Sequence, residues 1–557
     1  MPKRIMILIT AAFIMLAIGQ ASAAEKPVIA FSQTAGTDGS ALPIDAVATY
    51  TKGSKIYAFL PGVWTGSDIH LWFTGAEEAT VDGNTVKSGD IVPVTAERMR
   101  IVINRKTYDL SILRGSTIPV LFIRTESGSL ENIEASKENK ETGELLMLNE
   151  KGGQEYAGAL KYVKMRGNMS TRFLKKNYGI KLETGTDLLG FGKAKRWVLT
   201  GNNRDHSLLR NQVTFEMARY TGMAYTPDCA QTDLYINNEY RGTYLLSDKI
   251  EINGGRVEID SLEDDTEAVN DMPLENYAPV GPDEAEEGRF KAWNIPQDPA
   301  DITGGYLVEF EEYASRYAEE ASAYMTLKGN ILAVKSPEYA SIAQMTYITE
   351  LMQSFENAIF NTEGIDLDTG CHYSEIADVP SMAMKFMVEE ISKNYDGSNS
   401  SQFFYKMRDN VSMLLYAGPV WDYDSAYGSY GHKGGEGLLK PSGFSQTYVT
   451  KKNDWWAVLY HHKDFRAVVR ELWQSRFRQA LQILAGEAPE EGGLRSIDAY
   501  AEDIRSSAEM NFIRWPMKTS STNIANTGKT FQANVDFMRR FISKRCAWLD
   551  KQWGSSK

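Results

Sequence analysis

Two acidic segments in the second half of the chain contain residues that could carry out metal-assisted group transfer. The first reads NYDGSNSSQFFYK over residues 394–406 and contains Asp396. The second reads GPVWDYD over residues 418–424 and contains Asp422 and Asp424. Both segments place carboxylates beside an apolar or aromatic run, where the end of a strand can hold them rigidly. One acid could then orient a hydroxyl while the others hold a divalent cation, which suits phosphoryl transfer.

A basic loop earlier in the chain could bind phosphate. Residues 166–181 read RGNMSTRFLKKNYGIK, after one predicted strand and leading into another. Small and polar residues let backbone N–H groups approach phosphate oxygens, and the nearby Arg and Lys side chains supply positive charge. The loop is neither GxxxxGK[ST] nor GxGxxG, so a basic, solvated hairpin is an equally good interpretation of these residues alone.

These segments, in the order in which they follow one another along the chain, resemble the CotH kinase family of secreted atypical protein kinases, named after a spore-coat protein. The resemblance implies that Asp396 is the base that accepts the proton of a substrate hydroxyl. It implies that Asp422 holds Mg²⁺ (or Mn²⁺), with Asp424 assisting or capping the next turn. Five residues after the base, where many members carry Asn or Ser, this chain has Ser401. Serine is a weaker ligand than Asn, so a second cation would be held loosely or through water.

The basic loop resembles the family pattern RGNSS followed by KK-Y-x-I-K, which takes the place of a glycine-rich loop. The ATP ligands that this implies are Arg166, Asn168, Ser170 and one of Lys176 and Lys181. Lys181 is preferred because it is expected to end a strand, but both lysines stay open.

One further acid is implied on the helix predicted after the loop. Glu216 could pair with the phosphate-binding lysine, as the small-lobe helix of kinases does, although a solvated helical Glu is as good an interpretation. Two residues depart from the family pattern: Met169 interrupts the loop, and Asp248 stands where the strand before the linker usually has Glu.

The elements around these residues predict an α+β fold. Short β-prone runs and turn signals from about residue 27 to 115 predict a small β-sandwich, with a spacer or accessory role favoured over ligand binding. Strands and one helix then follow in the order seen in the small lobe of a protein kinase, at residues 118–123, 162–165, 208–220 (the helix), 231–236 and 242–246. A strand over 304–311 leads into a largely helical region that includes helices over 342–357 and 380–393.

Two charged stretches are predicted to lie outside these elements. Residues 130–155 are expected to form an exposed hairpin or loop, and residues 262–300 a mobile insertion. The predicted organisation is a signal peptide (1–23), a β-sandwich accessory domain (27–115), an atypical two-lobed protein-kinase-like domain (117–515) and a C-terminal helical extension (516–557).

Charge and the N-terminal segment limit the partners and the compartment. The chain has 73 acidic and 60 basic residues, a net charge of -13, so nucleic acid is not an expected partner. Lys3 and Arg4, an apolar stretch to Gly19 and the small residues 21–23 form a cleavable export signal, too short for a membrane span. We therefore expect a bacterial, secreted or cell-surface protein, with the β-domain possible as a contact to the surface or wall.

Three functions are compatible with these residues. The first is an exported kinase that transfers the γ-phosphoryl group of ATP to Ser or Thr of surface or secreted proteins, or of itself. The second is a catalytically silent assembly or binding protein that keeps the fold. The third and most remote is a glycoside hydrolase, which would need two carboxylates facing each other across a sugar.

Overall fold

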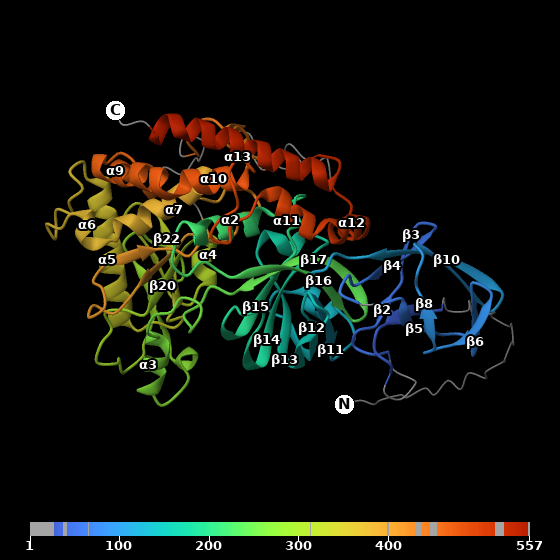
Figure 1. Ribbon diagram of the computed structural model, residues 1–557. Coiled ribbons are helices and arrows are strands. Elements are labelled where there is room, and N and C mark those ends of the chain that lie inside the picture. The colour runs from blue at the N-terminus through green and yellow to red at the C-terminus, as the bar shows by residue number, and fades with distance from the viewer. Residues whose placement is uncertain are drawn as a thin grey trace, which may run out of the picture.

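The protein has a mixed α+β fold with three parts side by side: N-terminal β-sheets, a closed barrel and a helical C-terminal region (Figure 1). The computed structural model describes residues 27–36, 42–64, 66–311, 314–397, 400–429, 436–445, 454–517 and 528–554. The predicted signal peptide lies outside these residues. At this level the α+β prediction is confirmed.

The N-terminal part consists of two sheets that share one apolar core. Alternation of buried and exposed residues makes the strands, as in β9 (Arg98–Ile103), where Met99, Ile101 and Ile103 point inward. The first sheet has the order β2-β1-β5-β8, made of Val47–Ala48, Ile29–Ser32, Asp68–Phe73 and Ile91–Pro93. The second has the order β3-β4-β10-β9-β6-β7, which adds Tyr50–Lys52, Lys55–Leu60, Lys106–Arg114, Glu78–Val81 and Asn84–Lys87.

The next part closes into a seven-stranded barrel in the order β11-β12-β13-β14-β15-β17-β16. Its strands are Val120–Thr125, Lys140–Leu148, Gln154–Arg166, Asn177–Asp187, Lys193–Thr200, Glu239–Asp248 and Cys229–Ile236. Helix α2 (Arg210–Tyr220) joins β15 to β16, so the predicted helix and the strands around it are confirmed.

The expectation of an exposed hairpin or loop over residues 130–155 is confirmed only in part, because β12 and β13 do form an antiparallel hairpin but both strands belong to the barrel. This stretch forms α1 (Glu131–Ala135), the barrel strand β12 and the start of β13. Its charged side chains misled the prediction because they occupy the outer face of β12, whereas Leu145 and Met147 point into the core.

The C-terminal region is built on a seven-stranded sheet of order β18-β19-β21-β22-β20-β23-β24. Its strands are Pro279–Val280, Phe290–Trp293, Ala323–Met325, Ile331–Ser336, Tyr306–Glu311, Phe403–Lys406 and Leu415–Ala417. The expected mobile insertion over 262–300 is instead structured: Ser261 caps α3 (Leu262–Ala268), and β19 pairs with β21.

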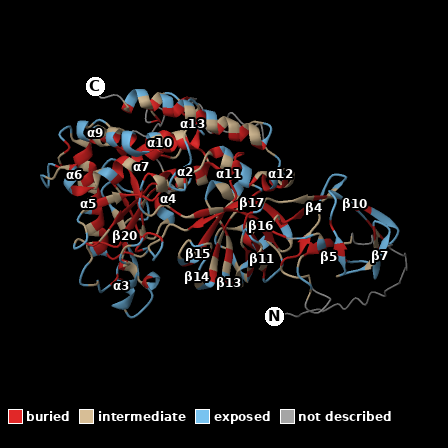
Figure 2. Ribbon diagram, in the orientation of Figure 1, coloured by how far each residue is buried: buried red, intermediate tan, exposed pale blue. Residues whose placement is uncertain are grey.

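Helices bury one another and one face of this sheet. Helices α5 (Ile342–Phe360) and α7 (Val379–Ser392) confirm the two predicted there, and Asp378 caps α7. The long helix α13 (Phe531–Trp553) lies along the top of Figure 1 and buries Leu549 and Trp553 in the same core as α10 (Arg478–Leu484) (Figure 2).

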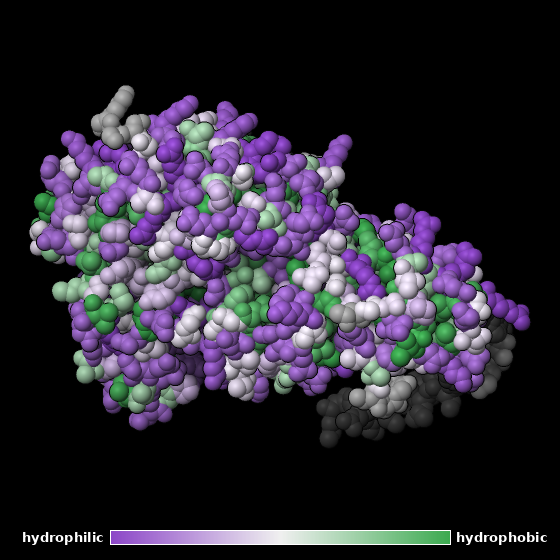
Figure 3. Space-filling model, in the orientation of Figure 1, coloured by the Kyte–Doolittle hydropathy of each residue, from purple (hydrophilic) through white to green (hydrophobic). Residues whose placement is uncertain are grey.

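Hydrophilic side chains dominate the face of the molecule seen in Figure 3. Within the ranges that the structure describes, no helix has both the length and the apolar composition to cross a membrane.

The N-terminal sheets are joined to the barrel through the β16–β17 hairpin. The Tyr235 hydroxyl donates to the carbonyl of Phe59 at 2.9 Å, and the Ala48 amide donates to the Asn238 carbonyl at 2.8 Å. The Phe59 ring lies 5.0 Å from that of Tyr240, and one hydrophobic core runs across the junction. The N-terminal sheets and the barrel therefore bury side chains against each other that would be exposed if either part stood alone.

This shared core predicts that the N-terminal sheets and the barrel unfold together. Phe59→Ala removes a fully buried ring and should lower the free energy of unfolding by about 3–5 kcal/mol. Calorimetry should show one transition, shifted to lower temperature, whereas Ile91→Ala, at a 59% exposed position, should leave it in place. Two separate transitions, with only one of them moved by Phe59→Ala, would contradict the shared core.

Candidate active site

The two acidic segments meet at one end of the β23–β24 hairpin. Helix α7 ends at Ser392, and the left-handed backbone of its C-cap residue Lys393 (φ 49°) turns the chain into residues 394–397. The antiparallel pairing of β23 with β24 then returns the chain to the same end of the sheet. Asn394 Nδ2 donates to the backbone carbonyl of Asp422 at 3.4 Å, so Asp396 and Asp422 lie on adjacent backbone segments.

A buried carboxylate on α7, Glu389, holds the two acidic segments next to each other. It accepts hydrogen bonds from Lys385 Nζ at 2.5 Å, from the Tyr423 hydroxyl and from Asn394 Nδ2 at 3.2 Å. Gly397 is required beside it, because a Cβ there would lie 2.7 Å from Glu389 Oε2. Sequence reasoning missed Glu389, although its i, i+4 spacing from Lys385 on an apolar helix was a usable signal.

The second acidic segment is also held from the side of the barrel. Asn211 of α2 accepts a hydrogen bond from the Tyr423 amide at 2.6 Å. Arg210 Nε donates to the Ala426 carbonyl at 2.9 Å and forms a buried ion pair with Asp205. The backbone that carries Asp422 and Asp424 is therefore bound to both halves of the molecule.

Asp422 and Asp424 make a concentrated pair of negative charges. The crowding of Asp422 by surrounding protein and by Asp424 raises its pKa to about 7, against the opposing effect of Arg166 and Arg204, although its side chain is exposed to solvent. Burial also raises the pKa of Asp424, which accepts a hydrogen bond from Ser425 Oγ at 2.8 Å. Two carboxylates that disfavour each other's charge are suited to bind a cation.

These two carboxylates fit Mg²⁺ better than a metal held by protein ligands alone. Over the described part of the chain, no three His, Cys, Asp or Glu side chains gather as a metal-binding group. Mg²⁺ is commonly bound by one or two carboxylates and takes its other ligands from substrate phosphates and water. Asp422 and Asp424 are the residues that would hold it.

Arg166 faces Asp422 across the junction between the barrel and the C-terminal region. It ends β13, and its guanidinium lies 5.4 Å from the centre of the Trp421 ring. Burial lowers the pKa of Arg166, while Asp422 and Glu309 oppose that shift. Among the residues that the structure describes, its guanidinium makes neither a hydrogen bond nor an ion pair, so its N–H donors are available for an anion.

A row of cations continues from there across the outer face of the barrel. The register places Lys181 of β14 beside Arg196 of β15, and Lys249 follows the end of β17. Glu251 forms ion pairs with two of these cations, Arg196 at 2.8 Å and Lys249 at 3.5 Å. Burial and the charges of Arg196 and its basic neighbours lower the pKa of Lys181. An anion in this place would relieve their repulsion.

Residues 163–549 match the family described as CotH kinase protein, which is well over half of the chain. The chain belongs to the CotH kinase family. No curated protein matches it. The CotH kinase match includes both acidic segments, the basic loop and most of α13, and leaves the N-terminal sheets outside.

Within the CotH kinase region, the other loop residues shape the loop itself. Asn168 Oδ1 accepts a hydrogen bond from Arg316 of α4 (Ala314–Glu319) at 2.8 Å. Ser170 Oγ donates to the Arg166 carbonyl at 3.4 Å, and Lys176 Nζ donates to the Thr171 carbonyl at 2.6 Å. Of the two candidate lysines, Lys176 is thus tied to its own loop and Lys181 belongs to the cation row.

Two expectations about individual residues need correction, and one stays a prediction. Lys181 lies within β14 (Asn177–Asp187) and does not end a strand. Glu216 forms its ion pair with Arg219, at 2.7 Å and one helical turn away, and not with a lysine of the loop. Ser401 has a left-handed backbone (φ 57°), and its role as a weak ligand of a second cation stays a prediction.

Sequence reasoning also missed Arg196, Lys249 and Arg204 of this CotH kinase site. Arg196 follows two lysines on its strand, Lys249 follows Asp248 at the end of a strand, and Arg204 stands in a loop, and nothing in these patterns marks any of the three as a ligand. The register of the barrel strands brings Arg196 and Lys249 together, and sequence alone does not set that register.

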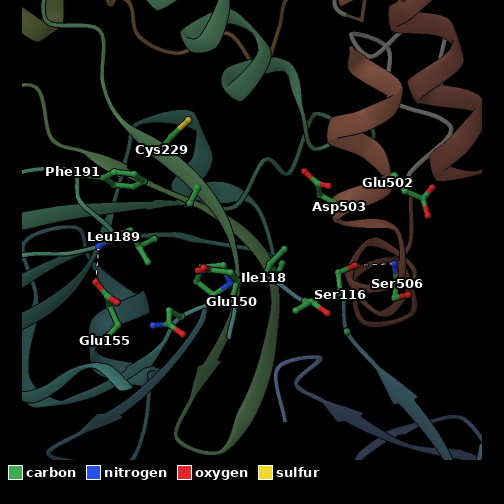
Figure 4. Close-up of a pocket in the computed structure, with 15 residues that line it drawn as sticks. Ser116, Ile118, Glu150, Glu155, Leu189, Phe191, Cys229, Glu502, Asp503 and Ser506 are labelled. Atoms are coloured by element: carbon green, nitrogen blue, oxygen red, sulfur yellow. Dashed lines mark hydrogen bonds between the residues drawn. The ribbon is translucent and has the colours of Figure 1, made fainter. Parts of the chain in front are cut away.

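A separate pocket of about 890 Å³ lies between the barrel and the end of α11 (Ile497–Asp503) (Figure 4). It contains none of the predicted site residues. Three of its acids already have partners: Glu155 accepts from the Leu189 amide at 2.8 Å, Asp503 pairs with Arg495 at 2.5 Å, and Glu502 pairs with Arg505 at 2.6 Å. The pocket is therefore not the candidate active site.

The Glu389 network predicts a large stability effect from a small change. Glu389→Gln leaves the buried Lys385 ammonium without its counter-charge, so the free energy of unfolding should fall by about 3–5 kcal/mol in urea titration. Glu350→Gln, at an exposed position of α5, is the matched control and should change it by less than about 0.5 kcal/mol. Equal stabilities for the two variants would show that Glu389 does not hold the site together.

Proposed function

We propose that this member of the CotH kinase family is an exported, Mg²⁺-dependent kinase that transfers the γ-phosphoryl group of ATP to Ser or Thr hydroxyls. The acceptors would be surface or secreted proteins, or the chain itself. One observation carries the proposal: the Arg166 guanidinium, which makes neither a hydrogen bond nor an ion pair with the described residues, faces Asp422 of the acid pair. An anion-binding cation opposite a cation-binding acid pair is what a Mg²⁺-nucleotide requires.

The proposal makes the two halves of the CotH kinase region the two lobes of a protein-kinase-like domain. The barrel with α2 would be the small lobe and the helical region the large lobe, with the N-terminal sheets as a β-sandwich outside them. Export is supported by the sequence of residues 1–23. Contact with the cell surface through the sandwich belongs to the same proposal.

ATP would lie along the junction of the two lobes. Its phosphates would meet Arg166 and Lys181, with Arg196 and Lys249 adding positive charge. The adenine ring of ATP would pack on a cluster of partly buried apolar side chains, among them Tyr225, Ile250 and Trp421. An acidic chain would thus bind a polyanion through a local basic surface.

The half-buried Asp396 carboxylate would orient the acceptor hydroxyl and take its proton. The hydroxyl oxygen then bonds to the γ-phosphorus while the bond from that phosphorus to the bridging oxygen breaks, and ADP leaves. Asp422 and Asp424 would hold Mg²⁺, which when bound neutralises charge on the phosphate oxygens. Arg166 would orient the phosphates by hydrogen bonds that a lysine could not match in geometry.

A catalytically silent binding protein is the second candidate. The observation that favours it is the Glu216–Arg219 pair, because it takes Glu216 away from the phosphate-binding lysine that an active kinase would pair with it. A glycoside hydrolase gains no support, since the acids lie beside cations and not across an open groove from each other.

The proposal predicts Mg²⁺-dependent transfer of radiolabelled phosphate from ATP to a Ser/Thr acceptor or to the chain. Asp422→Asn should reduce transfer to background, and Asp396→Asn should slow it by about 10²–10⁴-fold. The control Asp368→Asn changes an exposed loop acid and should leave the rate as it is.

Calorimetry on the same proteins separates the two candidates. ATP binding that requires Mg²⁺ and Asp422, with no transfer by the wild type, would replace the kinase by the silent binder. Transfer that survives Asp422→Asn would reject the assignment of the site.

A further inference from the structure

We infer that Arg204 is a further catalytic residue, which donates hydrogen bonds to the phosphoryl group during transfer and is placed there by stacking on Phe173 of the basic loop. The inference rests on the proposed kinase function and assigns a role to a residue outside both acidic segments and the basic loop.

The chain around Arg204 is fixed beside the second acidic segment. Asn202 accepts a hydrogen bond from Asn211 Nδ2 at 3.0 Å, and Asn211 Oδ1 accepts one from the Tyr423 amide at 2.6 Å. On the other side, Asp205 pairs with Arg210, whose Nε donates to the Ala426 carbonyl. Arg204 stands between these two anchors, so its backbone lies alongside residues 422–426.

Phe173 orients the Arg204 side chain. The Arg204 guanidinium lies 5.0 Å from the centre of the Phe173 ring. Phe173 belongs to the basic loop and directly follows its short helix, Met169–Arg172. A guanidinium that rests on an aromatic face is held by its π surface, and its N–H groups point outward in its plane. The position of Arg204 thus depends on the loop being in place.

Electrostatics supports a location at the acid pair. Arg204 is the strongest of the groups that lower the pKa of Asp424, and it also lowers that of Asp422, whereas Arg166 acts on Asp422. The two arginines therefore have different places. Arg166 lies over Trp421 at the start of the loop, whereas Arg204 lies over Phe173, on the segment held beside residues 422–426.

This placement gives Arg204 a role in the transfer step. As the acceptor oxygen bonds to the γ-phosphorus and the bond to the ADP oxygen breaks, charge shifts among the phosphoryl and leaving oxygens. Fixed N–H donors lower the barrier most when they are aimed at that charge before the reaction begins. Arg204 neither gains nor loses a proton, and Asp396 takes the proton of the acceptor.

The test compares kcat and KM for ATP in Arg204→Gln, Arg204→Lys and Phe173→Ala. Arg204→Gln should lower kcat by about 10²–10³-fold, with KM for ATP changed by less than about threefold. Arg204→Lys keeps the charge but not the planar fork, so it should recover only part of the rate. Phe173→Ala should also lower kcat, and adding it to Arg204→Gln should cause no further loss.

Two controls accompany these variants. Arg98→Gln removes an exposed positive charge from the N-terminal sheets and should leave kcat unchanged. Urea titration checks that each variant is folded, and Arg204→Lys is the variant to rely on if Arg204→Gln is not.

The possible results have separate meanings. An unchanged kcat in folded Arg204→Gln or Arg204→Lys would overturn the inference, as would a loss confined to KM. In both cases the kinase proposal would stand. Absence of transfer by the wild type would instead remove the proposed function, on which the inference depends.

Discussion

The candidate site depends on one buried ion pair, that of Lys385 with Glu389. A charged group inside a protein is costly unless its partners are close and well oriented, so Glu389 must keep its bonds to Lys385, Tyr423 and Asn394. Tyr423 lies between Asp422 and Asp424, and Asn394 lies two residues before Asp396. One carboxylate therefore sets the position of both acidic segments on the rigid end of α7.

The acid pair that this ion pair positions has unfavourable backbone and charge features. Asp422 has a left-handed backbone (φ 61°) and sits beside a second carboxylate, and the cations facing the pair come from the barrel. Such features cost stability and are typical of functional sites. The long helix α13 adds rigidity, because Arg545 pairs with Glu390, the residue next to Glu389 on α7.

The candidate acids and several of the elements that carry them could be predicted from the sequence, for a physical reason. Asp396, Asp422 and Asp424 adjoin apolar runs that can only be strand ends or turns, and α5, α7 and β20 have clear periodicity. The closed barrel could not be read in this way, because closure depends on which strands pair. The charges of residues 130–155 hid a barrel strand, since one face of such a strand is exposed. Arg196, Lys249 and Arg204 stayed hidden because only tertiary contacts bring them to the acids.

Crystallography with Mn²⁺ and a non-hydrolysable ATP analogue tests the central claim most directly. The account predicts an anomalous peak coordinated by Asp422 and Asp424 and by phosphate oxygens, with Arg166 within hydrogen-bond distance of the same phosphates. Mn²⁺ and nucleotide bound elsewhere, for instance between Glu150 and Glu502 in the separate pocket, would contradict it.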